Sequence, residues 1–174
     1  MEWPWGTIVN GPALALNQIG PYYPAPTLWI GAKYSVSTQQ RWSRTRILLL
    51  LPVPSVPPTS FATLQFQLQS IQAKTAQLQV WQTPNINYPG NPGEPQNTDF
   101  YNIPSGNLIT TLPLGSTPLG LVQVPLQMPL VYTQIVGGTY LAIGLSADQE
   151  VAGGYPTSTD ETWTITGQPA MFCS

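Results

Sequence analysis

The side chains best placed to do chemistry are six carboxylates in the second half of the chain. The 174 residues contain no histidine and a single cysteine, Cys173. The chain therefore lacks the commonest general base and metal ligand, and one cysteine forms neither an intrachain disulfide nor a cysteine metal cage. Two carboxylates at a suitable separation are enough for a glycosidase, and loop carboxylates can hold calcium. The six candidates are Glu94, Asp99, Asp148, Glu150, Asp160 and Glu161.

The surroundings of these six acids argue against a catalytic or metal site. They occur in turn-like or strand-edge sequence, and no loop has the ligand spacing of an EF-hand. The glycine pairs at 137–138 and 153–154 lack the lysine and hydroxyl residue of a phosphate-binding loop. We therefore predict a non-enzymatic protein with no catalytic residue, no bound metal and no cofactor.

Charge is scarce and unevenly placed along the chain. Only 7% of the residues are charged, against about 25% in an ordinary soluble domain, so Thr, Gln, Ser and Pro must cover the surface. Weak repulsion between copies favours association, although an extracellular domain with a neutral surface would show the same composition. All five basic residues precede the six acids. The two groups could meet head to tail between copies, or intermix when the chain folds.

The elements that must position these residues are predicted to be strands. Apolar residues alternate with Gln or Thr over residues 64–69, 77–80 and 162–166, which is typical of half-buried strands. Twenty prolines leave few windows for a helix, and the glycines at 137–138 predict a hairpin turn. Further β-type runs, making about ten strands in all, are residues 27–30, 34–38, 45–51, 108–112, 119–124, 130–136 and 139–145. Residues 27–174 are thus predicted to form one all-β domain, a sandwich or single jelly roll.

Residues 1–26 differ from the rest because they are rich in proline and aromatic residues without a sustained period. We interpret them as an extended N-terminal arm. Large aromatic side chains on such an arm need a surface to bury against. The arm would lie on or exchange with a neighbouring subunit through Trp3, Trp5, Tyr22 and Tyr23, or else fold back over its own barrel.

A basic and aromatic cluster follows at residues 41–46. It could contact nucleic acid or anionic lipid headgroups. The alternative is a solvated or subunit-facing sheet edge, where arginine discourages wrong strand pairing. No large basic patch accompanies it, so we expect no sequence-specific nucleic-acid binding. Together with the aromatic residues of the arm, the predicted subunit interface includes Arg41, Trp42, Arg44 and Arg46.

The start of the chain shows no signal peptide, because residues 1–5 have neither a basic start nor a long apolar run. The longest apolar run, residues 47–53, is far shorter than the roughly 20 residues of a membrane-spanning helix. We expect synthesis in the host cytoplasm without a leader.

The whole chain resembles the small major capsid proteins of tailless, icosahedral bacteriophages of Thermus that contain an internal membrane, a sphaerolipovirus-like group. The resemblance rests on the length, the start at residues 1–5, the Gln- and Thr-rich segment 61–69 and the terminal Cys173. It implies an upright single jelly-roll coat protein in the virion of a thermophilic virus. The expected partners are further copies of itself, as a homodimer or higher oligomer, and a larger coat protein. Peripheral contact with the internal membrane is also implied.

Two other functions fit the same composition. A jelly-roll carbohydrate- or receptor-binding module would stack sugar rings on exposed aromatic residues, for which the candidates are Trp29, Trp42, Trp81 and Tyr88. A capsid decoration protein or spike subunit would share the structural class of a coat protein and sit on a finished shell.

Overall fold

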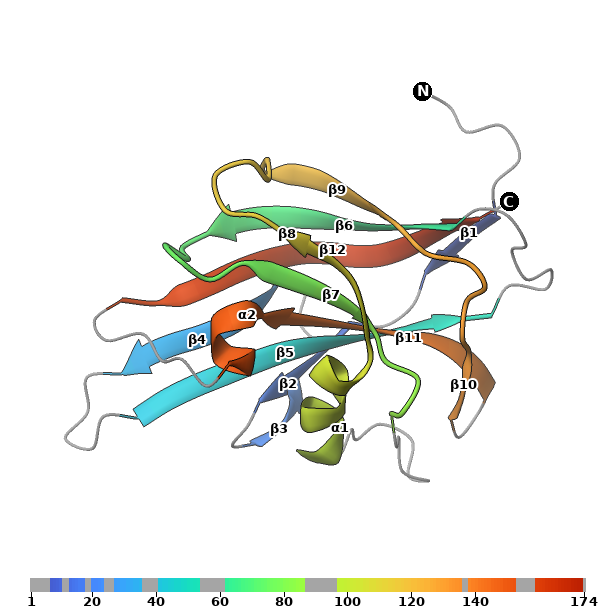
Figure 1. The fold of residues 1–174 in the computed structure, drawn as a ribbon, viewed down its shortest axis with the longest axis horizontal. Helices are drawn as coiled ribbons and strands as arrows, with labels where there is room; N and C mark the ends of the chain where they lie inside the picture. The colour runs from blue at the N-terminus through green and yellow to red at the C-terminus, as the bar shows by residue number, and fades with distance from the viewer. Residues whose placement is uncertain are drawn as a thin grey trace.

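The chain forms one antiparallel sheet that curls into a half-barrel (Figure 1). The computed structural model describes residues 7–10, 13–17, 20–23, 27–35, 41–53, 62–86, 97–135, 138–152 and 159–173. Its strands are β1 (Thr7–Asn10), β2 (Ala13–Asn17), β3 (Gly20–Tyr23), β4 (Thr27–Ser35), β5 (Arg41–Pro52), β6 (Ala62–Ile71), β7 (Leu78–Gln82), β8 (Asn107–Leu112), β9 (Gly120–Pro125), β10 (Thr133–Ile135), β11 (Gly138–Ala147) and β12 (Glu161–Cys173). The short helices are α1 (Asn97–Asn102) and α2 (Asp148–Val151), and a 3-10 turn, η1, spans Ile103–Ser105. The predicted all-β class is confirmed.

Eight strands follow one another across the sheet in the order β8, β7, β11, β5, β4, β12, β6, β9. β1 extends the sheet along the second half of β12, and β2 pairs with the middle of β5 and with β3. β10 and β11 form the predicted hairpin, with Ile135 opposite Gly138. β8 and β9 end the eight-strand path, and each pairs with a single strand among the described residues, so we call their outer sides the free edges of the path.

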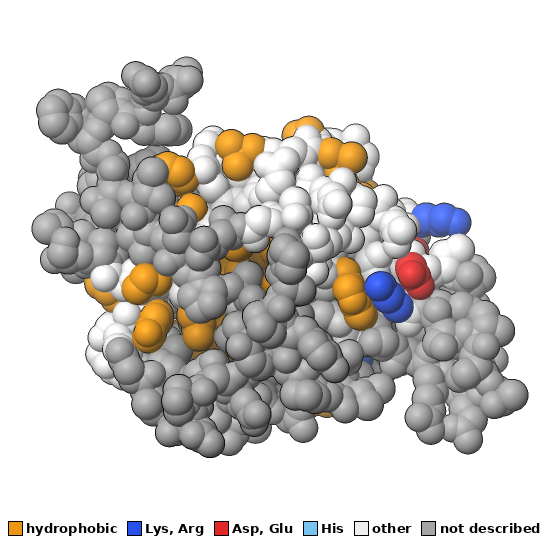
Figure 2. Space-filling model, turned by 180° about the vertical axis from the view of Figure 1, so that it is seen from behind, with side chains coloured by type: hydrophobic (Ala, Val, Ile, Leu, Met, Phe, Trp, Pro, Cys, Tyr) orange, Lys and Arg blue, Asp and Glu red, His pale blue; other side chains and the backbone are white. Residues whose placement is uncertain are grey.

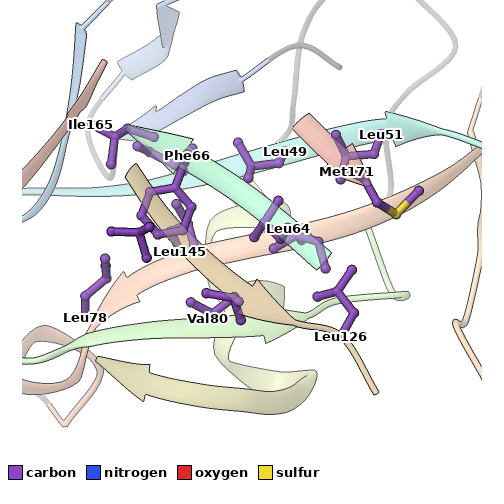
Figure 3. Close-up of a cluster of buried hydrophobic side chains, with 14 of the residues drawn as sticks. Leu49, Leu51, Leu64, Phe66, Leu78, Val80, Leu126, Leu145, Ile165 and Met171 are labelled. Atoms are coloured by element: carbon purple, nitrogen blue, oxygen red, sulfur yellow. The ribbon is translucent and has the colours of Figure 1, made fainter. Parts of the chain in front are cut away.

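The concave side of the sheet holds the main core (Figure 3). In β6 the alternation predicted from the sequence is present, since Leu64, Phe66 and Leu68 are buried while Gln67 and Gln69 are exposed. β12 contributes Trp163 and Ile165, which are also buried. Burying one face of each strand in this way supplies the main driving force for the fold.

β5 and β11 are buried on both faces over much of their length, which explains the unbroken apolar runs at residues 47–51 and 140–145. Ile47, Leu49 and Leu51 face the main core. Leu48 and Leu50 point the other way, into a second cluster. A strand covered on both sides reads as an apolar run without alternation.

The cover over the second face is a short helical segment that the sequence did not predict. Phe100 of α1 and Ile103 of η1 pack on the outer face of β5 and β11. η1 lies so close that a Cβ added at Gly144 of β11 would stand 2.4 Å from an Ile103 methyl carbon. α1 has six residues, too few for a helical period to be legible or for the helix to be stable alone, so tertiary packing must hold it.

The described part of residues 1–26 is extended, but it belongs to the sheet. β1 pairs with β12 from Thr7 opposite Cys173 to Asn10 opposite Ala170, and β2 pairs with β5. Tyr22 and Tyr23 lie in β3, which pairs with β2. The structure describes their backbone but not their side chains. Trp3 and Trp5 lie outside the described residues. Exchange of this segment between subunits stays a prediction.

No helix in the part of the chain that the structure describes combines the length and apolar character needed to cross a membrane.

Candidate interaction surface

Charged residues from both halves of the chain meet at one end of the half-barrel. The register brings the start of β12 beside the end of β4, with Glu161 opposite Ala32, and the end of β11 beside the start of β7, with Ala147 opposite Leu78. Figure 2 shows blue and red side chains toward the right-hand side of the visible face, while its upper part is white with separate orange side chains. We call this the charged end; it comprises Lys33, Lys74, Asp148, Asp160 and Glu161.

Glu161 anchors the loop between β6 and β7 to the charged end. Its Oε2 accepts three consecutive backbone N–H groups, from Lys74 at 2.9 Å and from Thr75 and Ala76 at 3.0 Å. Burial of this carboxylate acts to raise its pKa, but the hydrogen bonds from the loop outweigh burial and hold the pKa of Glu161 below its usual value. The ionised form is thus the one that the fold stabilises.

Asp148 holds the same loop from the other side. Its Oδ1 accepts the backbone N–H of Gln77 at 2.8 Å and that of Gln149 at 2.7 Å. Trp163 adds a third tie, since its indole N–H donates to the Ala76 carbonyl at 2.9 Å. Two of the six carboxylates considered for catalysis therefore bind backbone donors of the protein itself.

Nothing in the sequence indicates these roles of Glu161 and Asp148. The donors that Glu161 binds lie 85 to 87 residues earlier in the chain, so only the fold brings them together. Glu94 lies outside the described residues, as do the side chains of Asp99 and Glu150. Among the described residues, no group of three or more His, Cys, Asp or Glu side chains is arranged to hold a metal ion. The absence of enzymatic activity stays a prediction.

The basic cluster does not form a sheet edge, which corrects the sequence-based interpretation. β5 has β11 on one side and β4 and β2 on the other. Arg44 and Arg46 are buried on its outer face. Their guanidinium carbons lie 5.7 and 4.0 Å from the centre of the Phe100 ring, and Arg46 Nη1 donates to the Phe100 carbonyl.

These two arginines therefore pack inside their own chain, under α1. The sequence could not reveal this, because Phe100 follows Arg46 by 54 residues. The side chains of Arg41 and Trp42 are outside the description. A role for the four residues at a subunit interface stays a prediction.

Replacing Phe100 by leucine is expected to lower the free energy of unfolding by about 2 kcal/mol, because the change removes both cation–π contacts while leaving an apolar side chain in the second cluster. Urea denaturation followed by tryptophan fluorescence measures the loss. Tyr101, which is 56% exposed and meets the Phe100 ring edge to face, gives the control: Tyr101→Leu removes that ring pair but neither cation–π contact, and should cost less than about 1 kcal/mol. Equal losses from the two variants would contradict the stacking.

The aromatic residues considered for sugar binding do not share one platform. Trp29 of β4 is half-buried with the Lys33 ammonium 4.5 Å from its ring. Trp81 of β7 is half-buried and donates its indole N–H to Ser146 Oγ at 2.8 Å. β11 and β5 lie between these two strands. The Trp42 side chain and Tyr88 lie outside the description.

The free edge at β9 is the most unusual surface among the described residues, and the sequence pattern does not distinguish it from the other strands. Leu119 and Leu121 are 60% and 58% exposed. A groove of about 320 Å³ runs beside them, lined in part by Leu112, Pro113, Pro118, Leu121, Val122 and Gln123. The groove is thus formed by β9 together with the turn that joins it to β8.

This edge also lacks the usual protection against strand pairing. No charged residue occurs in residues 47–73 or 100–147, so β6, β8 and β9 carry none. Natural edge strands are commonly guarded by lysine, inward-pointing charges or proline, and here only Pro125, at the end of β9, is of that kind. Exposed leucines on an uncharged edge favour contact with another protein surface.

Neither a known protein-family model nor a curated protein sequence matches this chain. The structure defines the class as an all-β protein built on a single curled antiparallel sheet. Its function is therefore inferred from the fold and its surfaces.

Proposed function

We propose that this chain is a viral coat subunit that self-associates and tiles an icosahedral shell together with a second, larger coat protein. The observation that carries the proposal is the nesting of strand pairs. β4 pairs with β12, β5 with β11, β6 with β9 and β7 with β8, each antiparallel. The first of these eight strands pairs with the last, the second with the last but one, and so on inward.

This nesting supports a single jelly roll as the finer description of the fold. A long hairpin rolled around a barrel axis gives such pairs, and it divides the eight strands into two groups of four. Here the groups would be β8, β7, β11, β5 and β4, β12, β6, β9. Jelly rolls are common in viral capsid proteins and also occur in lectins and cupins, so the fold alone leaves the function open.

The surface supports the coat role over a free-standing module. A domain with little charge and exposed leucines on a free edge is poorly protected against association in solution. In a shell the same features become contacts, because neighbouring subunits cover them. Because charged residues gather at one end, the two ends of the subunit differ. This difference suits a subunit that stands upright in the shell, with the charged end facing water and the other end in peripheral contact with the membrane.

Purified protein is expected to sediment as a dimer or larger species and to form higher assemblies when mixed with candidate larger coat proteins. Analytical ultracentrifugation and negative-stain microscopy measure the two steps. Because few charges contribute, association should persist in high salt, where ion pairs are screened.

A protein that stays monomeric alone and in every mixture would contradict the coat role. A rise in melting temperature with mono- or disaccharides would favour the carbohydrate-binding alternative. Binding only to preformed shells would favour a decoration or spike protein.

A further inference from the structure

The hydrogen-bonding groups of β9 divide cleanly between its two sides. Leu126 N donates to Ala62 O at 2.9 Å, in register with the pairing of Val124 with Leu64 and Val122 with Phe66. In an antiparallel pair, alternate residues direct both backbone groups to the partner strand. Val122 and Val124 therefore bond to β6, and the residues between them direct their N–H and C=O groups to the free edge.

The outward-directed groups on this edge belong to Leu121, Gln123 and Pro125. Proline has no N–H, and prolines in sheets are confined to positions whose N–H would face away from the partner strand. Pro125 satisfies that rule here, which agrees with the alternation. The edge thus offers two N–H donors and three carbonyl acceptors with no strand beside them among the described residues.

The groove lies between residues 121–123 of β9 and the turn at residues 113–118 that joins β8 to β9. Its lining includes Val122, whose side chain is buried, and Leu121 and Gln123, whose side chains are exposed. An extended segment lying there could reach the outward backbone groups.

We propose that β9 pairs antiparallel with β9 of a second copy, across a two-fold axis at Val122, so that one sheet continues through two subunits. The inference rests on the proposed self-association and specifies its contact. The two-fold axis places Leu121 of one copy opposite Gln123 of the other. Each of the two donors in one copy then meets a carbonyl of the other, which makes four backbone hydrogen bonds at the centre.

The side chains fit the same register. Leu121, 58% exposed in the single chain, comes opposite Gln123 of the second copy, whose side chain is exposed on the same face, so the leucine is covered by the aliphatic part of the glutamine in each of the two pairs. No like charges face each other, because β6, β8 and β9 contain no charged residue. The contact is isologous and closes after two copies.

The test introduces charge on the proposed contact. L121K/Q123K places lysine opposite lysine and is expected to raise the dimer dissociation constant at least about 100-fold, as measured by analytical ultracentrifugation of the full chain. L121E/Q123E should be monomeric for the same reason. An equimolar mixture of the two variants should form a heterodimer, which misfolded chains could not do.

Q67K/Q69K is the matched control. It adds two lysines to the same outer face, at exposed positions of β6, which has strands on both sides, and it should dimerise as the unmodified chain does. Dimers of L121K/Q123K as stable as those of the unmodified chain, or a monomeric unmodified chain, would overturn the β9 contact. If the chain still assembles with coat partners, the coat role stands without this contact; if nothing assembles, the coat role fails as well.

Discussion

Replacing Glu161 by alanine is expected to lower the free energy of unfolding by about 4 kcal/mol at neutral pH. The change leaves the N–H groups of Lys74, Thr75 and Ala76 without their acceptor, and of the three lost bonds the one to Ala76 is buried and the other two are partly buried. Each buried donor left unpaired costs roughly 1 to 3 kcal/mol, and water entering the site offsets part of the sum. Urea denaturation at pH 7 measures the loss.

Glu161→Gln separates the charge from the shape of the side chain. The amide oxygen can accept the same three bonds without a negative charge, so we expect a smaller loss of about 1 to 2 kcal/mol. A matched control is Asp160→Asn, which alters the neighbouring carboxylate. Glu161→Ala as stable as the unmodified chain would show that the carboxylate does not hold the loop.

The stability difference between the unmodified chain and Glu161→Gln is expected to depend on pH with a defined sign. Because the pKa of Glu161 is lowered in the folded protein, the ionised side chain stabilises the fold fully above its unfolded pKa of about 4.3. That contribution is lost as the pH falls through the lowered folded pKa. The stability gap between the unmodified chain and Glu161→Gln should therefore be widest near pH 7 and shrink below about pH 4. A gap that widens with acid would contradict the assignment.

Replacing Gly31 by alanine is expected to cost about 4 kcal/mol as well, for a steric reason. Gly31 has a φ of 114°, which L side chains rarely adopt, and a Cβ there would stand 2.2 Å from the Glu161 carbonyl oxygen of β12. The strained backbone alone costs roughly 1 to 3 kcal/mol. Relief of the clash would require β4 and β12 to separate at the charged end, since Gly31 pairs with Thr162.

Gly115→Ala isolates the backbone part of this cost. Gly115 has a φ of 79° and nothing lies within 4 Å of its added Cβ, so we expect a loss of about 1 to 2 kcal/mol from strain alone. Thermal and urea denaturation of both variants give the comparison. Equal losses at the two positions would mean that β12 does not approach Gly31 closely.

Several strands were predictable because apolar side chains alternate with polar ones along them. In β6 and in the first half of β12, apolar residues alternate with Gln or Thr, and the structure buries the apolar ones. The hairpin of β10 and β11 followed from its glycine turn. The sequence alone therefore indicated which residues of these strands face the core.

Other elements were misread because their environment comes from distant parts of the chain. The sequence of β5 is an apolar run with a basic start, which suggested a strand at the edge of the sheet. In the structure β5 lies inside the sheet, because β11 pairs with it on one side and β4 and β2 on the other. α1 is too short to leave a helical period and exists as cover for the second cluster. The loop-binding role of Glu161 depends on residues 85 to 87 positions away.

The sequence by itself determined the all-β class, much of the strand pattern, the scarcity of charge and the lack of histidine. These properties are local or compositional, so they need no knowledge of which segments meet. Only the tertiary structure decided the nesting of the strand pairs, the partners of Arg46 and Glu161 and the free edge at β9. Alternation of side chains specifies which face of a strand is buried but not which strand lies beside it. The free edge at β9 depends on which strands pair, so only the tertiary structure shows it.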